Sequence, residues 1–310
     1  MDIRHCAQLL REHDNYLLVT HLRPDGDTLG SAAGLCHALR RLGKTAHLYH
    51  NADITDNYRV YVGRYLAPEG YAYDKVISLD TATDKLLPPD FEGSIWMALD
   101  HHGSHVPYAE STLVWGHKAS CGEIVLTLIQ ELLGTPDKEE AELLYIAVST
   151  DTGCFRYANT KADTLRAAAE LLDAGADVPP IIKHLFRTKT RARLKLEGLI
   201  YNDIRSYRDN AINVAVVTMA MLEQAGATEN DCDDLANLAC QVEGNHCAIT
   251  AREMPGFTKI SLRTDGTVDA SAVCARFGGG GHKMAAGCEL SCGPEEAVDR
   301  IRIAVEDVWA

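Results

Sequence analysis

The chain has 310 residues, a length that predicts two domains, and a net charge of −14 that argues against wrapping long duplex nucleic acid. No apolar run reaches membrane-spanning length, and the first residues lack the basic and then apolar order of a secretory signal. The ten cysteines are scattered without Cys-x-x-Cys pairs, which favours reduced thiols and a cytoplasmic enzyme without a membrane partner.

Strands and helices alternate along the first part of the chain. An amphipathic helix over 2–13 precedes predicted strands at 15–20, 44–50, 75–80, 95–100 and 112–115. Helices are expected from about Gly30 and Ser31 to Leu42, and over 120–133, 137–149, 161–174 and 178–186. This alternation predicts an α/β domain with a mainly parallel sheet and helices on both of its faces.

The pattern changes beyond a boundary placed near 187–205. Further strands are expected at 211–217, 246–252 and 258–263, and further helices near 230–242, 269–276 and 294–308. We therefore predict a first domain over 1–187, a linker helix over 188–205, and a smaller α/β domain over 206–310.

Four segments of the first domain carry side chains of the kind that bind divalent metals, and three of these segments follow predicted strands. The side chains are His21, Asp25, Asp27, Asp80, Asp100, His101, His102 and Asp151. Because the carboxyl ends of parallel strands share one edge of a sheet, these groups can converge there. Separate helix caps and turn formers are the alternative, but four such segments in register favour a common site.

Gathered carboxylates repel one another and raise each other's pKa values unless divalent cations neutralise them. Asp25 and Asp27 are two residues apart in a predicted tight loop, a spacing that lets them face two neighbouring ions. Mixed carboxylate and imidazole ligands suit Mn²⁺ better than Mg²⁺ or Zn²⁺. Two such ions can hold an attacking hydroxide and polarise a phosphoryl oxygen, which is the chemistry of phosphoester hydrolysis.

The second domain carries a candidate anion-binding segment. Four consecutive glycines, residues 278–281, leave bare backbone N–H groups, with Arg276 before them and His282 after them. A flexible hairpin turn is the alternative. Arg263, at the end of a predicted strand, can grip a terminal phosphate or simply be solvated, and we expect Arg156 of the first domain to contact phosphate.

These motifs resemble those of a known family. The series His21-x-x-Pro-Asp25-Gly-Asp27-x-x-Gly-Ser31, Asp80, Asp100-His101-His102 and Asp151-Thr-Gly resembles that of DHH phosphoesterases. The segment Gly278-Gly279-Gly280-Gly281-His282-x-x-Ala-Ala-Gly287 resembles the signature of the DHH-associated C-terminal domain. Together they are similar to the nanoRNase branch, which combines oligoribonuclease and 3′-phosphoadenosine-5′-phosphate phosphatase activities.

The resemblance implies a role for each matching residue. His21, Asp25 and Asp80 would hold a first manganese ion, and Asp27, Asp80, His101 and Asp151 a second, with Asp80 bridging the two. Asp100 would orient a ligand histidine, and His102 would contact the scissile phosphate or donate to the leaving oxygen. Substrate would be bound by Arg156, Arg263, Arg276, Gly279, Gly280, Gly281 and His282. Family members often form homodimers, although no stretch of this sequence identifies an interface.

We therefore predict a metal-dependent phosphoesterase that hydrolyses short single-stranded oligoribonucleotides to mononucleotides and removes the 3′-phosphate of 3′-phosphoadenosine-5′-phosphate. A cyclic- or linear-dinucleotide phosphodiesterase would use the same ions and glycine segment. A pyrophosphatase or polyphosphatase would call for a more basic second domain. A nucleotide-binding protein without turnover and an RNA-binding module are the alternatives that are not enzymes.

Overall fold

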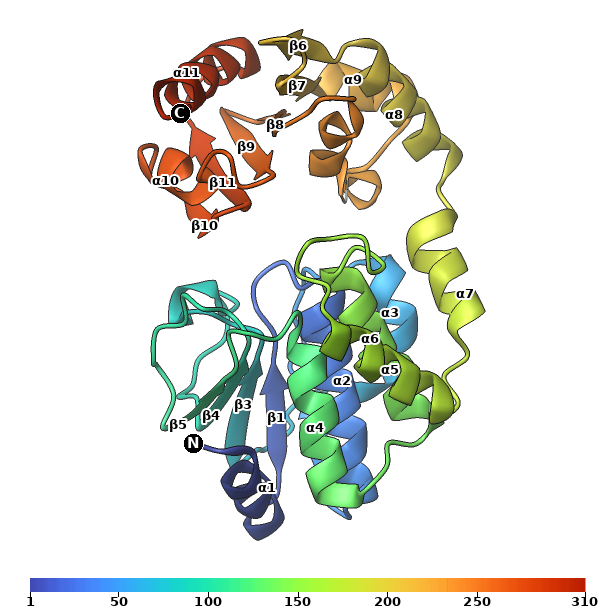
Figure 1. Ribbon diagram of the computed structural model, residues 1–310. Coiled ribbons are helices and arrows are strands. Elements are labelled where there is room, and N and C mark those ends of the chain that lie inside the picture. Colours follow the sequence, from blue (N-terminus) through green and yellow to red (C-terminus); the bar gives the residue numbers. More distant parts are fainter. Residues whose placement is uncertain (233, 310) are drawn as a thin grey trace. The chain divides into compact units, whose positions relative to one another are not determined.

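A computed structural model describes residues 1–232 and 234–309. The chain forms two compact units, Met1–Thr188 and Lys189–Ala310. The first contains a five-stranded sheet and the second a separate six-stranded sheet, which confirms the predicted α/β class (Figure 1). None of the described helices is long and apolar enough to cross a membrane.

The sheet of the first unit is entirely parallel, with strand order β2-β1-β3-β4-β5. Its strands are β1 (Tyr16–Val19), β2 (Ala46–Leu48), β3 (Lys75–Leu79), β4 (Met97–Asp100) and β5 (Ser111–Val114). The residues of β1 and β4 are all buried, as expected for central strands covered on both faces. The carboxyl ends of all five strands therefore meet at one edge of the sheet.

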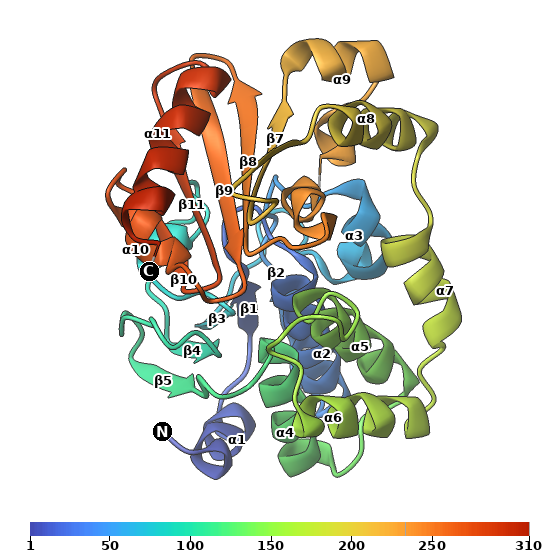
Figure 2. The same ribbon diagram turned by 45° about the horizontal axis from the view of Figure 1, so that its top comes forward.

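Helices cover only one face of this sheet. They are α1 (Ile3–Glu12), α2 (Gly26–Arg41), α3 (Asp56–Val62), α4 (Cys121–Leu133), α5 (Lys138–Asp151) and α6 (Ala162–Asp173), and they share one core with the strands (Figures 1 and 2). The opposite face, with Leu17, Val19 and Val76, packs against loop residues alone among those described. The prediction of helices on both faces is wrong, because turn-forming Pro and Gly residues interrupt the connections before β3 and β4.

Helix α2 begins one turn earlier than expected. Asp25 is its N-cap and accepts from the backbone N–H groups of Asp27 (3.0 Å) and Thr28 (3.2 Å), so Asp27 lies in the first helical turn and not in a loop. Gly30 does not open the helix either: a Cβ there would lie 2.4 Å from the carbonyl oxygen of Leu143 in α5. Glycine thus allows close packing of α2 on α5, and α5 carries Asp151 as its last residue.

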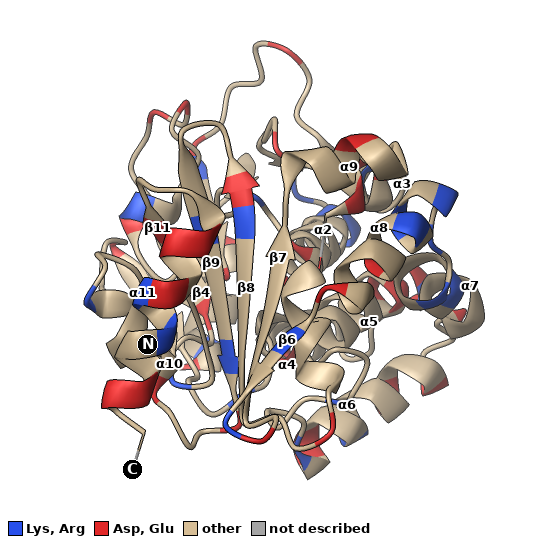
Figure 3. Ribbon diagram, turned by 90° about the horizontal axis from the view of Figure 1, so that it is seen from above, with Lys and Arg blue, Asp and Glu red and all other residues tan. Residues whose placement is uncertain are grey.

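The segment between the sheets contains α7 (Val178–Ile182), a π-helical turn at Lys183–Arg187, and α8 (Arg191–Asn202). Although α8 falls where a linker helix was expected, Leu196 and Ile200 are fully buried in a core of the second unit. Of its basic residues (blue in Figure 3), Arg191 and Lys195 are exposed, as expected for a solvated face, whereas Arg193 is half-buried and pairs with Glu197 at 2.6 Å. Lys189, just before the helix, pairs with the same carboxylate at 2.8 Å.

The sheet of the second unit has strand order β10-β11-β9-β8-β7-β6 and is antiparallel except between β7 and β8. The strands are β6 (Arg205–Tyr207), β7 (Ile212–Val217), β8 (Cys247–Met254), β9 (Phe257–Thr264), β10 (Gly280–His282) and β11 (Ala285–Leu290). Helices α10 (Ala270–Ala275) and α11 (Pro294–Asp307) pack on one face, and α8 with α9 (Met219–Ala225) contributes to a core on the other.

Several elements of this unit differ from the prediction. The short strands β6, β10 and β11 and the helix α9 were not expected. The helix predicted near 230–242 is three 3-10 turns, Glu229–Asp231, Leu235–Asn237 and Ala239–Gln241; residue 233 lies outside the described residues. Asp and Asn side chains here bond to nearby groups, as Asp231 does to Thr228, and such local bonds compete with a helix.

Candidate dinuclear metal centre

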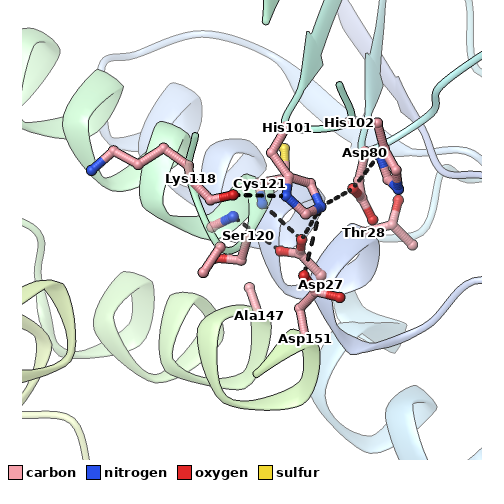
Figure 4. Close-up of polar contacts among 12 residues, drawn as sticks. Asp27, Thr28, Asp80, His101, His102, Lys118, Ser120, Cys121, Ala147 and Asp151 are labelled. Carbon is pink, nitrogen blue, oxygen red and sulfur yellow. Dashed lines mark hydrogen bonds and ion pairs between the residues drawn. The ribbon is translucent and has the colours of Figure 1, made fainter. Parts of the chain in front are cut away.

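The polar residues that follow the strands gather at one edge of the first sheet. His21 comes after β1, Asp80 after β3, and His101 after β4. Asp27 reaches the same place from the start of α2, and Asp151 reaches it from the end of α5. Figure 4 shows the side chains of Asp27, Asp80, His101 and Asp151 pointing toward one another.

One group of potential ligands is formed by His21, Asp25 and Asp80. The Nε2 atom of His21 lies 3.6 Å from Oδ1 of Asp25 and 3.7 Å from Oδ2 of Asp80. Its other ring nitrogen, Nδ1, is 2.8 Å from the carbonyl oxygen of Leu22. A proton on Nδ1 satisfies that carbonyl and leaves the Nε2 lone pair facing the two carboxylates.

A second group is formed by Asp27, His101 and Asp151. Nε2 of His101 lies 3.7 Å from Asp27, 3.6 Å from Asp151 and 3.3 Å from Oδ1 of Asp80. Its Nδ1 is 3.2 Å from the carbonyl oxygen of Lys118 (Figure 4). The ring is thereby held with Nε2 toward three carboxylates.

Asp80 is a member of the first group and also faces His101 of the second, so its two oxygens face different histidines. Oδ2 faces His21 and Oδ1 faces His101. The side chain is 4% exposed, and Oδ1 is buried without a hydrogen-bond partner. The backbone of Asp80 is left-handed, with φ +55°, a conformation that aspartate tolerates better than most residues. A buried carboxylate oxygen without a donor is costly in a protein, and a cation would satisfy it.

The N-terminus of α4 supports Asp27. The backbone N–H groups of Cys121 (2.7 Å) and Gly122 (3.0 Å) donate to its carboxylate, and so does the hydroxyl of Ser31 (3.2 Å). Analysis of the sequence did not identify Cys121 and Gly122 as part of this site. The signal available was the N-cap Ser120, which places the positive end of a helix dipole directly after it.

The cluster is electrostatically strained without cations. Burial raises the pKa of Asp27 well above its usual value, and the charges of Asp80 and Asp151 raise it further. Burial likewise raises the pKa of Asp151 to about 7, with a contribution from Asp80, although His101 acts in the opposite direction. Burial lowers the pKa of His101, but the carboxylate of Asp80, 3.3 Å away, and the charge of Asp27 outweigh it and bring the pKa to about 11. Divalent cations would replace these protons.

Asp100 binds the rings of two histidines other than His101. Its fully buried carboxylate accepts from Nδ1 of His102 (2.7 Å) and from Nδ1 of His105 (2.6 Å). From His101 it accepts only at the backbone N–H (2.8 Å), because the ring Nδ1 of His101 lies 3.2 Å from the Lys118 carbonyl. A role of Asp100 in orienting a metal-ligand histidine stays a prediction. Burial raises the pKa of Asp100, but the hydrogen bonds from His102 and His105 outweigh it and lower the pKa overall.

His105 is a residue of this site whose importance the sequence alone understated. Its side chain is only 4% exposed, and its Nε2 atom is buried without a hydrogen-bond partner. A histidine three residues after a strand-end motif suggests an ordinary loop position, and only the fold reveals the buried carboxylate that it shares with His102.

A left-handed turn follows Asp151. Gly153, Cys154 and Phe155 all have positive φ, and a Cβ on Gly153 would lie 2.3 Å from the ring of Tyr157. The turn exposes Arg156, whose Nε donates to the carbonyl oxygen of Gly153 at 2.6 Å. Arg156 thus follows the metal-ligand candidate Asp151 closely along the chain. Its contact with a phosphate stays a prediction.

The glycine segment of the second unit is partly a hairpin strand. A Cβ on Gly279 would lie 2.1 Å from the carbonyl oxygen of Gly287, and one on Gly281 would lie 2.6 Å from that of Ala285. Gly278 and Gly281 also have positive φ. Gly280 differs, because a Cβ there would meet nothing within 4 Å. Close packing therefore explains Gly279 and Gly281, and the left-handed backbone explains Gly278.

The other predicted substrate residues of the second unit are dispersed around this hairpin. Arg263 pairs in register with Ala285 of β11 and lies on the face of β9 opposite the buried Leu262. His282 is exposed at the end of β10. Arg276, just before the glycines, forms an ion pair of 3.6 Å with Asp307 of α11. Their role in binding stays a prediction.

A parallel sheet with clustered carboxylates and imidazoles at its strand ends, followed by a second α/β unit, is the architecture of the DHH phosphoesterases. Residues 15–148 match the family model for the DHH family, N-terminal domain, and residues 211–310 match that for the DHHA1 domain. The protein named bifunctional oligoribonuclease and PAP phosphatase NrnA of Thermus thermophilus is 32% identical over 98% of this chain and 94% of its own. The chain belongs to this NrnA family of phosphate-ester hydrolases.

Two further comparisons agree. The Bacillus subtilis protein of the same name is 26% identical, over 95% of this chain and 94% of its own. The crystal structure of an exopolyphosphatase-related protein from Bacteroides fragilis superposes with a TM-score of 0.88 at 26% identity, covering 98% of this chain and 95% of the other. Both extend across the two units.

Proposed function

We propose that the strand-end cluster binds two divalent cations. His21, Asp25 and Asp80 would hold one, and Asp27, Asp80, His101 and Asp151 the other. The observation that supports this proposal most strongly is Asp80, which turns one oxygen to His21 and the other to His101, and whose buried Oδ1 makes no hydrogen bond. Four aspartates against two divalent ions leave the site close to neutral, so a phosphate can approach it.

The donor set favours Mn²⁺, because carboxylate oxygens and imidazole nitrogens occur together in both groups. When bound, such ions supply Lewis-acid activation of a phosphoryl group and of an attacking water. The protein's own part is to hold the ligand rings: the carbonyl oxygens of Leu22 and Lys118 fix Nδ1 of His21 and of His101. A hydrogen bond at one ring nitrogen of a histidine determines which nitrogen is left to face the metal.

His102 is the residue we propose for handling the proton of the leaving oxygen. Asp100 holds its Nδ1, and Nε2 is the ring atom that would face a substrate. Burial lowers the pKa of His102, but the hydrogen bond to Asp100 and the charge of Asp80 raise it overall, which favours the protonated, donating form. Arg156 would offset charge that builds up on the phosphoryl oxygens.

We propose that the second unit binds the nucleotide. Gly279, Gly280 and Gly281 would offer backbone N–H groups, with Arg263, Arg276 and His282 as the charged and polar side chains around them. Gly280 supports this proposal, because neither its φ nor its neighbours within the chain require glycine. Close approach of a ligand to the backbone would require it.

Short single-stranded oligoribonucleotides and 3′-phosphoadenosine-5′-phosphate are the substrates that we propose. The names of the Thermus thermophilus and Bacillus subtilis relatives support both. The net charge of −14 disfavours long nucleic acid, which binds through many cationic contacts. We propose a cytoplasmic location, because all ten cysteines are free thiols. We propose a homodimer by analogy with the family.

Product analysis with Mn²⁺ tests this proposal. The panel contains a dinucleotide, a pentanucleotide, a 20-mer, 3′-phosphoadenosine-5′-phosphate, cyclic di-adenylate and pyrophosphate, each at equal phosphate concentration. We expect mononucleotides from the short oligomers and adenylate from 3′-phosphoadenosine-5′-phosphate. Faster turnover of the 20-mer than of the dinucleotide would contradict the short-substrate proposal, and preferential cleavage of cyclic di-adenylate would establish the cyclic-dinucleotide alternative.

The Asp27→Ala variant separates an enzyme from a nucleotide-binding protein. Removing a ligand of the second ion should abolish hydrolysis, whereas nucleotide binding to the second unit should survive. Hydrolysis at the wild-type rate would show that the ligand assignment is wrong. Binding of RNA that needs no metal and falls steeply with salt, without turnover, would instead indicate an RNA-binding module.

A further inference from the structure

A hollow of about 550 Å³ lies in the first unit, on the sheet face that loops cover. Its lining comes from Leu17 of β1, the two residues after β2, residues 67–71 and Tyr73 before β3, and residues 90–92 before β4. None of these residues belongs to the acidic and histidine cluster. The volume is that of a small-molecule site.

Aromatic rings form much of the wall. Tyr49 and Phe91 meet edge to face, with ring centroids 5.3 Å apart. Tyr71 turns its hydroxyl inward to the carbonyl oxygen of Tyr16 (3.4 Å), and Tyr73 is 38% exposed. Leu17 and Ala67 belong to the same apolar cluster and supply surface without charge. The hollow is therefore lined by four aromatic side chains, Tyr49, Tyr71, Tyr73 and Phe91, beside a small apolar floor.

The charge at the rim is negative. Glu69, Asp90 and Glu92 line the hollow, and no Lys or Arg is among its described lining residues. The pKa of Tyr49 is raised to about 12, because burial and a hydrogen bond to Asp90 both favour the neutral hydroxyl. The Tyr49 hydroxyl thus stays neutral beside the carboxylates of the rim. A phosphorylated nucleotide would meet three carboxylates here and be repelled.

We propose that this hollow binds a small organic cation, an alkyl chain that carries a guanidinium or ammonium group. Aromatic faces attract such cations through their quadrupoles, most strongly where water is partly excluded. The carboxylates at the rim add ion pairs, and the alkyl part covers the apolar floor. The site is separate from the phosphoesterase centre. It would bind cations, whereas the phosphoesterase centre would bind anionic phosphates.

Agmatine, which has a guanidinium and an amine on a four-carbon chain, is the probe. Titration into the full chain, followed by calorimetry and by NMR of the aromatic side chains, should show saturable binding with Kd below about 1 mM, a weak but specific affinity. Binding should weaken as salt is raised. Adenosine, neutral and aromatic, and 1-butanol, neutral and alkyl, should bind at least tenfold more weakly.

Two variants and one control locate the ligand. Tyr73→Ala and the double variant Asp90→Asn/Glu92→Gln should each weaken agmatine binding at least fivefold and leave dinucleotide hydrolysis unchanged. Tyr201→Ala removes a tyrosine of similar exposure, 42%, from α8 and should leave binding unchanged. Absence of saturable binding, equal binding of adenosine, or equal affinity in all variants would overturn the proposal.

Discussion

His102 donates through Nδ1 to the fully buried carboxylate of Asp100 across 2.7 Å. Replacing Asp100 with Asn removes the charge that holds the ring and favours its protonated form. We expect kcat on a dinucleotide to fall by roughly 10- to 100-fold, the usual cost of losing such a supporting group. Metal content measured by atomic emission should stay at the wild-type level. A variant that loses its metal instead would show that Asp100 supports a ligand rather than His102.

His105 should matter for stability as well as for activity. Its Nδ1 is 2.6 Å from the second oxygen of Asp100, which is buried, so His105→Ala leaves that oxygen without a donor. We expect a loss of about 1–3 kcal/mol in the free energy of unfolding, measured by urea denaturation. The exposed His117→Ala is the matched control and should change stability by less than about 0.5 kcal/mol. If the two variants are equally stable, the hydrogen bond from His105 to Asp100 does not stabilise the fold.

Removal of metal should abolish hydrolysis and lower thermal stability together. Chelation leaves Asp27, Asp80 and Asp151 close together without a cation, and their mutual repulsion then favours unfolding. Returning Mn²⁺ at about 100 times its Kd should restore about 2.7 kcal/mol. In the Asp27→Asn variant, a calorimetric scan should show a smaller rise in melting temperature with Mn²⁺. A rise as large as that of the wild type would exclude Asp27 as a ligand.

Two adjacent glycines should respond differently to alanine. Gly279→Ala places a Cβ against the carbonyl oxygen of Gly287 and the side chain of Cys288, so we expect a loss of about 1–3 kcal/mol in stability. Gly280→Ala meets nothing in the chain and should fold normally. It should nevertheless raise KM for a dinucleotide severalfold, because the methyl group occupies the surface that we assign to the ligand. An unchanged KM would argue that the hairpin is structural alone.

The ion pairs of Glu197 should make stability depend on pH. Burial raises the pKa of this carboxyl, but the hydrogen bonds from Lys189 and Arg193 outweigh it and lower the pKa in the folded protein. The stabilisation is therefore complete above the ordinary value of 4.5 and is lost as the pH falls below it. Glu197→Gln should cost about 1–3 kcal/mol at pH 7 and less near pH 3.

The control for that prediction is Glu296→Gln, which breaks an exposed pair with Arg300 at 3.8 Å. It should cost less than about 1 kcal/mol at either pH. Urea denaturation at both pH values measures each cost. If the cost of Glu197→Gln does not change between pH 7 and pH 3, its charge is not the source of the stabilisation.

Apolar runs and strand-end motifs were sufficient to predict the parallel sheet. Strands such as Met97–Asp100 are buried on both faces, and burial on both faces requires the nearly continuous apolar residues that the sequence shows there. The same logic placed Asp80 and His101 at a shared edge. The prediction of helices on both faces overlooked the Pro and Gly residues before β3 and β4, which favour loops over helices in those connections.

What the sequence alone determined is thus the order of the strands in the first unit along the chain and the set of polar groups that reach one edge of their sheet. Only the tertiary structure decided their partners: that Asp100 holds His102 and His105, that the start of α4 supports Asp27, and that each oxygen of Asp80 faces a different histidine. The reason is physical. Periodicity follows from neighbours along the chain, whereas hydrogen-bond partners depend on which distant segments packing brings within about 3 Å.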